Sequence, residues 1–307
     1  MAKVFIDGSA GTTGLRIRER LSERHDLELI LLPEELRKDT EARREALNSA
    51  DVAFLCLPDV AAIEAVSLVE NPNTAIIDTS TAHRVNPAWE YGFPELCGRR
   101  EAIAASKRIA NPGCHASGFV ALVEPLVRAG VLAPDASLTA YSLTGYSGGG
   151  KKMIAEYEGE GRDMLLDAPR MYGLTQSHKH LPEMSRVCGL SSAPIFCPVV
   201  ASYYSGMEVT VPLFGSDVKG GRDAISEVYR TYYQNGLVRF TEAADESGFL
   251  SANAFSGRDD MQITVTGNDE RILLVARFDN LGKGASGAAI QNMNILLGVD
   301  EGTGLVI

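Results

Sequence analysis

The chain has 307 residues, of which 45% are hydrophobic and 22% are charged, as in ordinary globular proteins. Its formal net charge of −11 and its pI near 5.0 argue against a nucleic-acid-binding protein, which would need a clustered basic surface. No apolar run approaches the roughly 18 residues that would span a bilayer, and no secretory leader precedes the first strand, so we expect a cytoplasmic protein.

Strand and helix patterns alternate over the first third of the chain. Nearly continuous apolar runs predict strands at residues 4–6, 27–32, 52–57 and 75–78. Helical spacing or composition predicts helices at residues 14–21, 39–49 and 60–69. Continuously apolar strands that alternate with helices indicate a parallel sheet buried on both faces.

A glycine-rich turn joins the first of these strands to the first helix. Gly8, Gly11 and Gly14 have the spacing G-x-x-G-x-x-G, which differs from the commoner G-x-G-x-x-G fingerprint. Glycine permits a tight turn and the close approach of a pyrophosphate, and the following helix N-terminus offers amide donors. Hydroxyl donors in the same turn belong to Ser9, Thr12 and Thr13. This context predicts a dinucleotide-binding site.

The residues after the second strand leave the choice between NAD and NADP open. An acidic residue there would hold the ribose 2′-hydroxyl of NAD. Glu34 and Glu35 follow a proline at this point, and Arg37 and Lys38 come directly after them. Arg37 and Lys38 either neutralise a 2′-phosphate or form a solvated helix face.

One of the five cysteines has a chemically suggestive setting. The five are irregularly spaced and form neither a C-x-x-C pair nor a zinc-type cluster, so we expect no disulfide framework and no metal site. Cys114 follows Asn-Pro-Gly and precedes a helix that we expect at about 119–129. Amide groups at a helix N-terminus favour a thiolate and stabilise an oxyanion. We interpret Cys114 as a nucleophile, the alternative being a buried packing residue.

Two histidines are candidates for the base that such a thiol needs. His178 and His180 stand two residues apart, just before Pro182, and proline suits the first turn of a helix. Residues two apart cannot share a helical face, but they point the same way from an extended segment, which we expect here. A metal site is the competing interpretation, although no third or fourth ligand is evident.

Longer segments with alternating hydrophobicity follow Cys114. They predict a mixed or antiparallel sheet with strands at 137–143, 195–201, 207–214, 261–266 and 271–278. The glycines within 147–150 predict a short mobile loop, and residues 285–297 return to a helical pattern. We expect a dinucleotide-binding domain of residues 1–114 plus about 282–307, and a second, α+β domain of about 115–281.

Five stretches of the chain together resemble one enzyme family. They span nearly the whole chain and read FIDGSAGTTGLRIRERL, IDTSTAHR, NPGCHASGF, HKHLPEM and DNLGKGASGAAIQNMN. The chain resembles N-acetyl-γ-glutamyl-phosphate reductases of the shorter type, within the aspartate-semialdehyde dehydrogenase-like superfamily. The resemblance implies an α/β fold, with a Rossmann-type parallel-sheet domain that binds NADP(H) and an α+β catalytic and dimerisation domain. It implies NADPH-dependent reduction of N-acetyl-γ-glutamyl phosphate to N-acetylglutamate 5-semialdehyde and phosphate, through a cysteine thioester, in arginine biosynthesis.

The resemblance also implies roles for particular residues. Cys114 matches the nucleophile of the family, and His178, the first histidine of H-x-H-x-P-E, matches its acid/base, with His180 ranked second. Asn280 is expected at the nicotinamide end of the coenzyme, the alternative being a capping residue. Ser80 is a further coenzyme-binding candidate.

An acyl phosphate substrate requires cationic partners. Arg84 is the first candidate because its planar fork suits phosphate, the alternative being a surface arginine. Lys151 and Lys152 follow the glycine cluster and either close over an anionic substrate or belong to a solvated loop. Asn111, in the Asn-Pro-Gly-Cys stretch, is the remaining substrate-binding candidate.

Two other interpretations stay open on the sequence. A sister reductase acting on aspartyl or aminoadipyl phosphate would share these motifs, because the residues do not reveal the length of the substrate pocket. A non-catalytic NADP-binding sensor would keep the glycines but have no need for Cys114 and His178. We expect a small-molecule substrate, no nucleic-acid or membrane partner, and a homo-oligomer, either a dimer or a tetramer.

Overall fold

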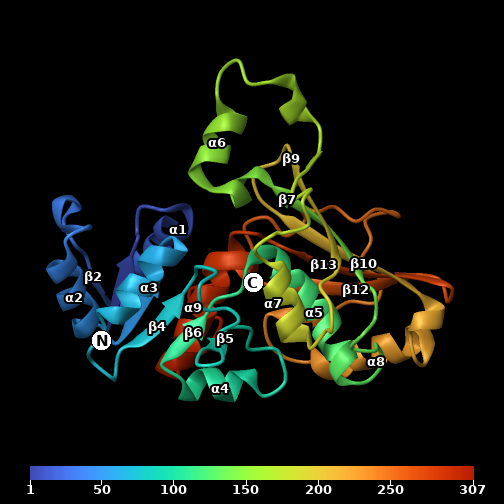
Figure 1. Ribbon diagram of the computed structural model, residues 1–307, viewed down its shortest axis with the longest axis horizontal. Coiled ribbons are helices and arrows are strands. Elements are labelled where there is room, and N and C mark those ends of the chain that lie inside the picture. The colour runs from blue at the N-terminus through green and yellow to red at the C-terminus, as the bar shows by residue number, and fades with distance from the viewer. The chain divides into compact units, whose positions relative to one another are not determined.

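The computed structural model describes residues 1–307 (Figure 1). The chain forms two compact units, each with its own internal contacts. The first unit consists of Met1–Pro94, Gly98–Pro112 and Ala285–Leu305. The second unit consists of Glu95–Cys97, Gly113–Gly284 and Val306–Ile307. The C-terminal helix therefore returns to the first unit after the chain has built the second.

A parallel sheet of six strands forms the centre of the first unit. The strand order is β2-β1-β3-β4-β6-β5, and every neighbouring pair is parallel. The strands are β1 Ala2–Asp7, β2 Leu27–Ile30, β3 Val52–Leu55, β4 Ala75–Asp78, β5 Glu90–Tyr91 and β6 Arg108–Ala110. The predicted parallel sheet is confirmed, with β5 and β6 added because neither short strand has a clear apolar run.

Helices bury both faces of this sheet. They are α1 Thr12–Ser22, α2 Thr40–Ser49, α3 Asp59–Ser67, α4 Arg99–Ala105 and α9 Gly287–Leu297, with a 3₁₀ turn at Glu34–Leu36. Val4 and Ile6 pack in one apolar cluster with Ile17 of α1 and Met293 of α9. Phe5, which points to the other face, packs in a second cluster with residues of α2 and α3. Burial on both faces explains why these strands are continuously apolar.

A mixed sheet of seven strands forms the second unit. The order is β11-β12-β13-β10-β7-β9-β8, in which β7 and β9 are parallel, β11 and β12 are parallel, and the other pairs are antiparallel. The strands are β7 Thr139–Gly145, β8 Arg170–Met171, β9 Ile195–Ala201, β10 Met207–Phe214, β11 Val238–Phe240, β12 Met261–Gly267 and β13 Arg271–Phe278. The expected mixed sheet is confirmed.

Four helices accompany this sheet, and α5 lies against β10 and β13 (Figure 1). They are α5 Cys114–Arg128, α6 Gly150–Glu158, α7 Leu181–Cys188 and α8 Gly221–Tyr232. Shorter helical turns span Tyr146–Gly149, Met164–Asp167, Gly215–Asp217 and Gly282–Ser286.

The start of α5 differs from the sequence expectation. The helix begins at Cys114 itself, whereas the apolar pattern predicted a start near residue 119. A Cβ placed on Gly118 would lie 2.6 Å from Cγ2 of Val209, so glycine lets the N-terminal part of this helix pack directly on β10. Tertiary packing thus extends the helix over residues whose own propensity is weak.

The glycine cluster at 147–150 is not a loop, contrary to expectation. Tyr146–Gly149 forms a 3₁₀ turn that leads straight into α6, and Gly150 adopts a φ of +71°, which suits glycine. Figure 1 shows α6 and the segment after it projecting from the rest of the second unit.

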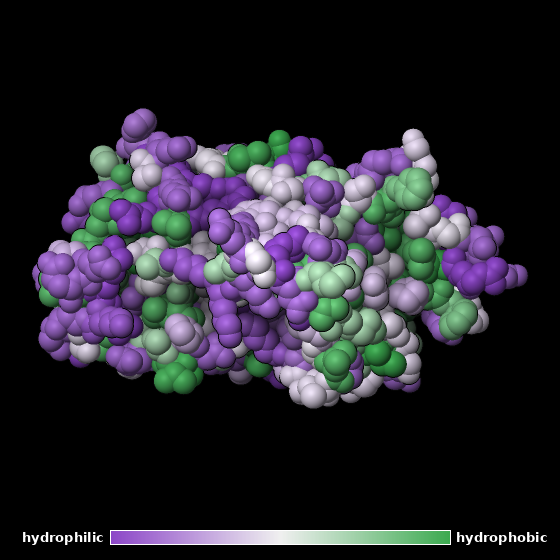
Figure 2. Space-filling view, turned by 90° about the horizontal axis from the view of Figure 1, so that it is seen from above, coloured by the Kyte–Doolittle hydropathy of each residue, from purple (hydrophilic) through white to green (hydrophobic).

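The exposed surface is mostly hydrophilic on the face drawn in Figure 2, where hydrophobic residues form small separate patches. No helix is both long enough and apolar enough to cross a membrane.

Candidate active site

The glycine turn adopts a geometry that only glycine permits at two positions. Gly8 has a φ of +84°, and a Cβ there would lie 2.3 Å from the carbonyl oxygen of Cys56. A Cβ on Gly14 would lie 2.5 Å from the carbonyl oxygen of Gly8. Gly11 caps α1, so Thr12 and Thr13 form its first turn, where amide groups point out of the helix. This is a suitable cradle for a pyrophosphate.

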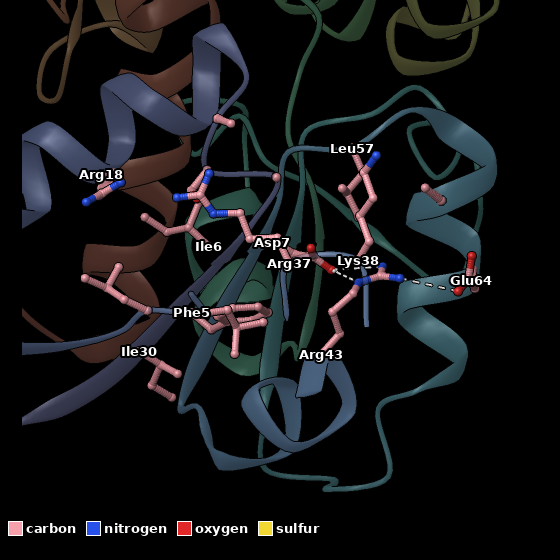
Figure 3. Close-up of a pocket in the computed structure, with 16 residues that line it drawn as sticks. Phe5, Ile6, Asp7, Arg18, Ile30, Arg37, Lys38, Arg43, Leu57 and Glu64 are labelled. Carbon is pink, nitrogen blue, oxygen red and sulfur yellow. Dashed lines mark hydrogen bonds and ion pairs between the residues drawn. The ribbon is translucent and has the colours of Figure 1, made fainter. Parts of the chain in front are cut away.

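A cavity of about 470 Å³ opens beside this turn, lined by the turn itself and by the residues that follow β2 (Figure 3). Two acidic side chains of the cavity, Asp7 and Glu64, are held by Arg43, whose guanidinium lies 3.0 Å from Asp7 and 3.3 Å from Glu64. Burial raises the pKa of Asp7, although the hydrogen bond from Arg43 acts in the opposite direction.

Three cations of the same cavity have no acidic partner. Arg37 and Lys38, two of the predicted coenzyme-binding residues, line it, and Nε of Arg37 is buried without a hydrogen-bond partner. Arg18 of α1 lines it as well and forms no ion pair; Figure 3 shows its side chain on the side toward which Arg37 points. Arg18 was not among the predicted coenzyme-binding residues, because its position in the helical pattern is typical of a solvated residue.

Cys114 is the first residue of α5 in the second unit. Gly113 is the N-cap, and its amide donates a 2.8 Å hydrogen bond to Oε1 of Glu183, which is buried on α7. The turn Gly282–Ser286 packs on the cysteine, because a Cβ on Gly284 would lie 3.0 Å from Cβ of Cys114. The thiol is partly exposed, as a nucleophile must be.

The two predicted histidines lie together, although through a turn rather than an extended segment. The His180 amide donates to Nδ1 of His178 at 3.2 Å, and the two rings are 4.7 Å apart. Leu181 begins α7 directly after this turn, which explains the tight geometry. Burial, together with the charge of Lys179, lowers the pKa of His178. His178 is therefore a neutral imidazole near pH 7.

His115 joins the same cluster, although it was not a predicted site residue. Its ring centroid lies 5.7 Å from those of both His178 and His180. It is buried, and its Nε2 and Nδ1 are 2.6 Å from Oη of Tyr172 and 2.7 Å from Oγ of Ser142. Burial lowers the pKa of His115 to about 3, with smaller contributions from His178 and Lys179. Its position beside Cys114 was the only signal available in the sequence.

Arg84 and Ser80 belong to a hydrogen-bonded loop after β4 in the first unit. Arg84 donates to the carbonyl groups of Asn111 (2.9 Å) and Thr79 (3.0 Å). Ser80 donates to Oδ2 of Asp78 at 2.7 Å, and the same carboxylate holds His83 at 2.6 Å. Arg84 thus braces the segment that leads to Cys114.

The remaining predicted residues differ in their surroundings. Asn280 is buried; its Oδ1 accepts from the Gly206 amide at 3.0 Å and its Nδ2 donates to Ser147 at 3.0 Å. Asn111 is also buried and donates to the Ala285 carbonyl at 3.1 Å. Lys151 and Lys152, by contrast, are exposed on α6. The contacts of Asn280 and Asn111 do not test the binding roles predicted for these two residues.

Two family models match the chain, one over most of each unit. The family model described as semialdehyde dehydrogenase, NAD binding domain, matches residues 3–106. The model described as semialdehyde dehydrogenase, dimerisation domain, matches residues 114–280.

Related proteins match over nearly their full length. N-acetyl-gamma-glutamyl-phosphate reductase 2 of a Nostoc species is 45% identical, covering 99% of each chain. The N-acetyl-gamma-glutamyl-phosphate reductase of a Chelativorans species is 48% identical over 96% of this chain and 98% of its own. The protein of the same name from Brucella ovis is 47% identical over 96% and 99%.

Solved structures share the fold at low sequence identity. Aspartate semialdehyde dehydrogenase II of Vibrio cholerae, complexed with ASA, has a TM-score of 0.73 at 17% identity, covering 97% of this chain and 98% of that one. Aspartate semialdehyde dehydrogenase of Candida albicans, solved with NADP, has a TM-score of 0.69 at 15% identity, covering 97% and 98%.

Proposed function

Because the chain belongs to the N-acetyl-γ-glutamyl-phosphate reductase family, we propose that it reduces N-acetyl-γ-glutamyl phosphate to N-acetylglutamate 5-semialdehyde and phosphate in arginine biosynthesis. The observation that carries the proposal is the identity of 45–48% over nearly the whole chain with proteins of this name. The second unit supplies a matching chemistry, because a partly exposed cysteine begins α5 and two histidines lie in the turn that leads into α7.

In this proposal the sulfur of Cys114 attacks the acyl carbon, the bond to the phosphate oxygen breaks, and a thioester forms. NADPH, when bound, supplies the hydride for the thioester carbon. The oxygen of the resulting thiohemiacetal re-forms the carbonyl, the carbon–sulfur bond breaks, and the thiolate and aldehyde separate. One proton is taken up overall and goes to the released phosphate.

His178 is suited to act as the proton donor in these steps. Its Nδ1 accepts from the His180 amide, so the proton of the neutral ring lies on Nε2. Through this N–H the neutral ring can donate a hydrogen bond to the developing oxyanion or to the phosphate oxygen as it leaves. His180 remains the second candidate for this role.

The coenzyme is NADPH in this proposal, and the first unit holds it. The turn of Gly8, Gly11 and Gly14 would hold the pyrophosphate, and Arg37, Lys38 and Arg18 would hold the 2′-phosphate. A buried guanidinium nitrogen without a hydrogen-bond partner destabilises the fold. A phosphate oxygen would accept a hydrogen bond from Nε of Arg37. Roles for Ser80 and Asn280 at the coenzyme, and for Arg84, Asn111, Lys151 and Lys152 at the acyl phosphate, remain predictions.

The test is the reverse reaction, followed as NADPH formation from NADP⁺, phosphate and a panel of semialdehydes. We expect turnover with N-acetylglutamate 5-semialdehyde and little with the aspartate or aminoadipate semialdehydes. Cys114→Ser is the matched control, which should lose turnover while binding NADPH as the wild type does. Preference for another semialdehyde would overturn the substrate assignment, and normal turnover by Cys114→Ser would overturn the mechanism.

The assembly we propose is a homodimer formed through the second unit, whose family model is described as a dimerisation domain. Strand register places Tyr141, Ile195, Phe214 and Leu273 on the sheet face opposite α5, and all four are exposed. Light scattering on the purified chain tests this, with Phe214→Asp expected to give monomers. The domain limits of residues 1–114 plus about 282–307 and about 115–281, and the cytoplasmic location, remain predictions.

A further inference from the structure

A hydrogen-bonded chain of three side chains in the second unit includes His115, the residue next to the cysteine. Ser142 of β7 is fully buried, and its Oγ lies 2.7 Å from Nδ1 of His115. Nε2 of His115 lies 2.6 Å from Oη of Tyr172, which follows β8. His115 is the residue after Cys114 in α5, so the middle member of this chain directly follows the cysteine.

The direction of the protons in this chain follows from what each group can donate. The hydroxyl of Ser142 has one proton, and its hydrogen bond with Nδ1 of His115 is the one bond that its side chain makes. A buried hydroxyl donates its proton wherever an acceptor is present, so Nδ1 is the acceptor. The single proton of neutral His115 therefore lies on Nε2 and is donated to Oη of Tyr172. The proton of Tyr172 must then point away from His115.

The hydroxyl proton of Tyr172 can stabilise the negative charge of the Cys114 thiolate. The sulfur lies near enough to Tyr172 that its negative form, after burial, contributes to raising the pKa of the phenol. Tyr172 consequently stays protonated and remains a donor at neutral pH. The His178 ring, 6.0 Å from that of Tyr172, adjoins the same space.

We propose that Ser142 is a positioning residue that fixes the tautomer of His115 and thereby directs the proton of Tyr172 toward Cys114. There the proton stabilises negative charge, first on the sulfur and then on the acyl oxygen during the proposed reaction. Without the Ser142 hydroxyl, the His115 ring is free to take its other tautomer and to accept the Tyr172 proton instead. Ser142 would then affect chemistry at the thiol without touching substrate.

The experiment measures the pH dependence of Cys114 alkylation by iodoacetamide, and kcat of the reverse reaction, in Ser142→Ala, Ser142→Thr and Tyr172→Phe. We expect Ser142→Ala and Tyr172→Phe to move the alkylation profile to higher pH. Tyr172→Phe should lower kcat by roughly 100-fold, as expected for a lost oxyanion donor, and Ser142→Ala by roughly 10-fold or more. Ser142→Thr keeps the hydroxyl and should restore both readouts.

The double variant Ser142→Ala/Tyr172→Phe separates this role from a merely structural one. Because Ser142 acts through Tyr172, the double variant should resemble Tyr172→Phe alone. Multiplied effects in the double variant, or Ser142→Thr as impaired as Ser142→Ala, would overturn the proposal. If Ser142→Ala does not fold, an unchanged alkylation profile in Tyr172→Phe overturns it equally. The step at the acyl oxygen rests on the proposed function, whereas the alkylation profile does not, so the two ideas can fail separately.

Discussion

Oε1 of Glu183 accepts a 2.8 Å hydrogen bond from the amide of Gly113, the residue immediately before Cys114. Glu183 stands in the first turn of α7, three residues after His180, and its side chain is buried. One carboxylate therefore connects the histidine segment to the helix start that presents the thiol.

We predict that Glu183→Ala lowers both stability and kcat, because it leaves a buried amide without its acceptor. The expected loss in the free energy of unfolding is about 1–3 kcal/mol. Glu183→Gln is the matched control, since its amide oxygen can accept the same hydrogen bond. Thermal unfolding and reverse-reaction kinetics measure the two effects. Equal damage from both substitutions would mean that the negative charge, and not the acceptor, is what matters.

The ranking of the two histidines gives a second prediction. His178→Asn should lower kcat by roughly 100-fold, the range for loss of a general acid or base. His180→Asn should cost less, because the contact of His180 with His178 runs through its backbone amide, which the substitution retains. NADPH binding, followed by fluorescence, serves as the control for both. A greater loss in His180→Asn would reverse the assignment.

The charge of Lys179 contributes to the lowered pKa of His178, so a substitution of Lys179 tests that pKa. Burial is the larger cause of the lowered pKa and the charge of Lys179 the smaller, so Lys179→Gln should raise that pKa. If the neutral ring is the active form, the acidic limb of kcat/KM lies below pH 6.5 in the wild type and moves to higher pH in the variant. Lys107→Gln in the first unit is the control and should leave the limb in place. A limb unaffected by Lys179→Gln would assign it to another group.

The buried imidazole of His115 predicts a loss of stability in acid. Its pKa of about 3 in the folded protein lies below the ordinary value of 6.5, so between these values the unfolded chain binds the proton that the folded protein excludes. Stability contributed by neutral His115 is present above pH 6.5 and is lost as pH falls toward 3. From pH 6.5 to 5 the loss amounts to at most about 2 kcal/mol.

His115→Gln isolates this effect in thermal unfolding scans at pH 7.5 and pH 5. The variant should be less stable at pH 7.5, because it loses the bonds to Tyr172 and Ser142. Its deficit should shrink at pH 5, where the wild type carries the cost of excluding a proton. A constant or growing deficit would show that His115 titrates normally.

The unpartnered cations of the first unit predict coenzyme preference. Arg37→Ala and Arg18→Ala should each raise KM for NADPH by roughly 10-fold or more, since a charge-assisted hydrogen bond is worth about 1.5–3 kcal/mol. KM for NADH, which has no 2′-phosphate, should change little. Arg44→Ala, at a residue already paired with Glu41 and Glu70, is the control. An equal rise for both coenzymes would place the two arginines elsewhere on the nucleotide.

Local patterns were sufficient for most of the fold. The strands of the first unit follow from apolar runs, and α2 begins where predicted because Asp39 accepts a hydrogen bond from the Ala42 amide. The spacing of Gly8 and Gly14 predicts a tight turn. In the structure, a Cβ atom added to either glycine would clash with a backbone carbonyl oxygen. By contrast, the first turn of α5 and the helical glycines before α6 depend on neighbours distant in the chain, which no local pattern reports.

By itself, the sequence determined the identity of the candidate groups: a cysteine after Asn-Pro-Gly, a pair of histidines, a glycine turn, and cations after the second strand. Hydrophobic period, turn residues and motif spacing are local properties, so they can be read along the chain. Only the tertiary structure decided that Tyr172 and Ser142 contact His115, that Glu183 contacts the amide before Cys114, and that Arg18 joins Arg37 at one cavity. Their protonation states and partners arise from burial among residues far apart in sequence, and burial exists only once the chain has folded.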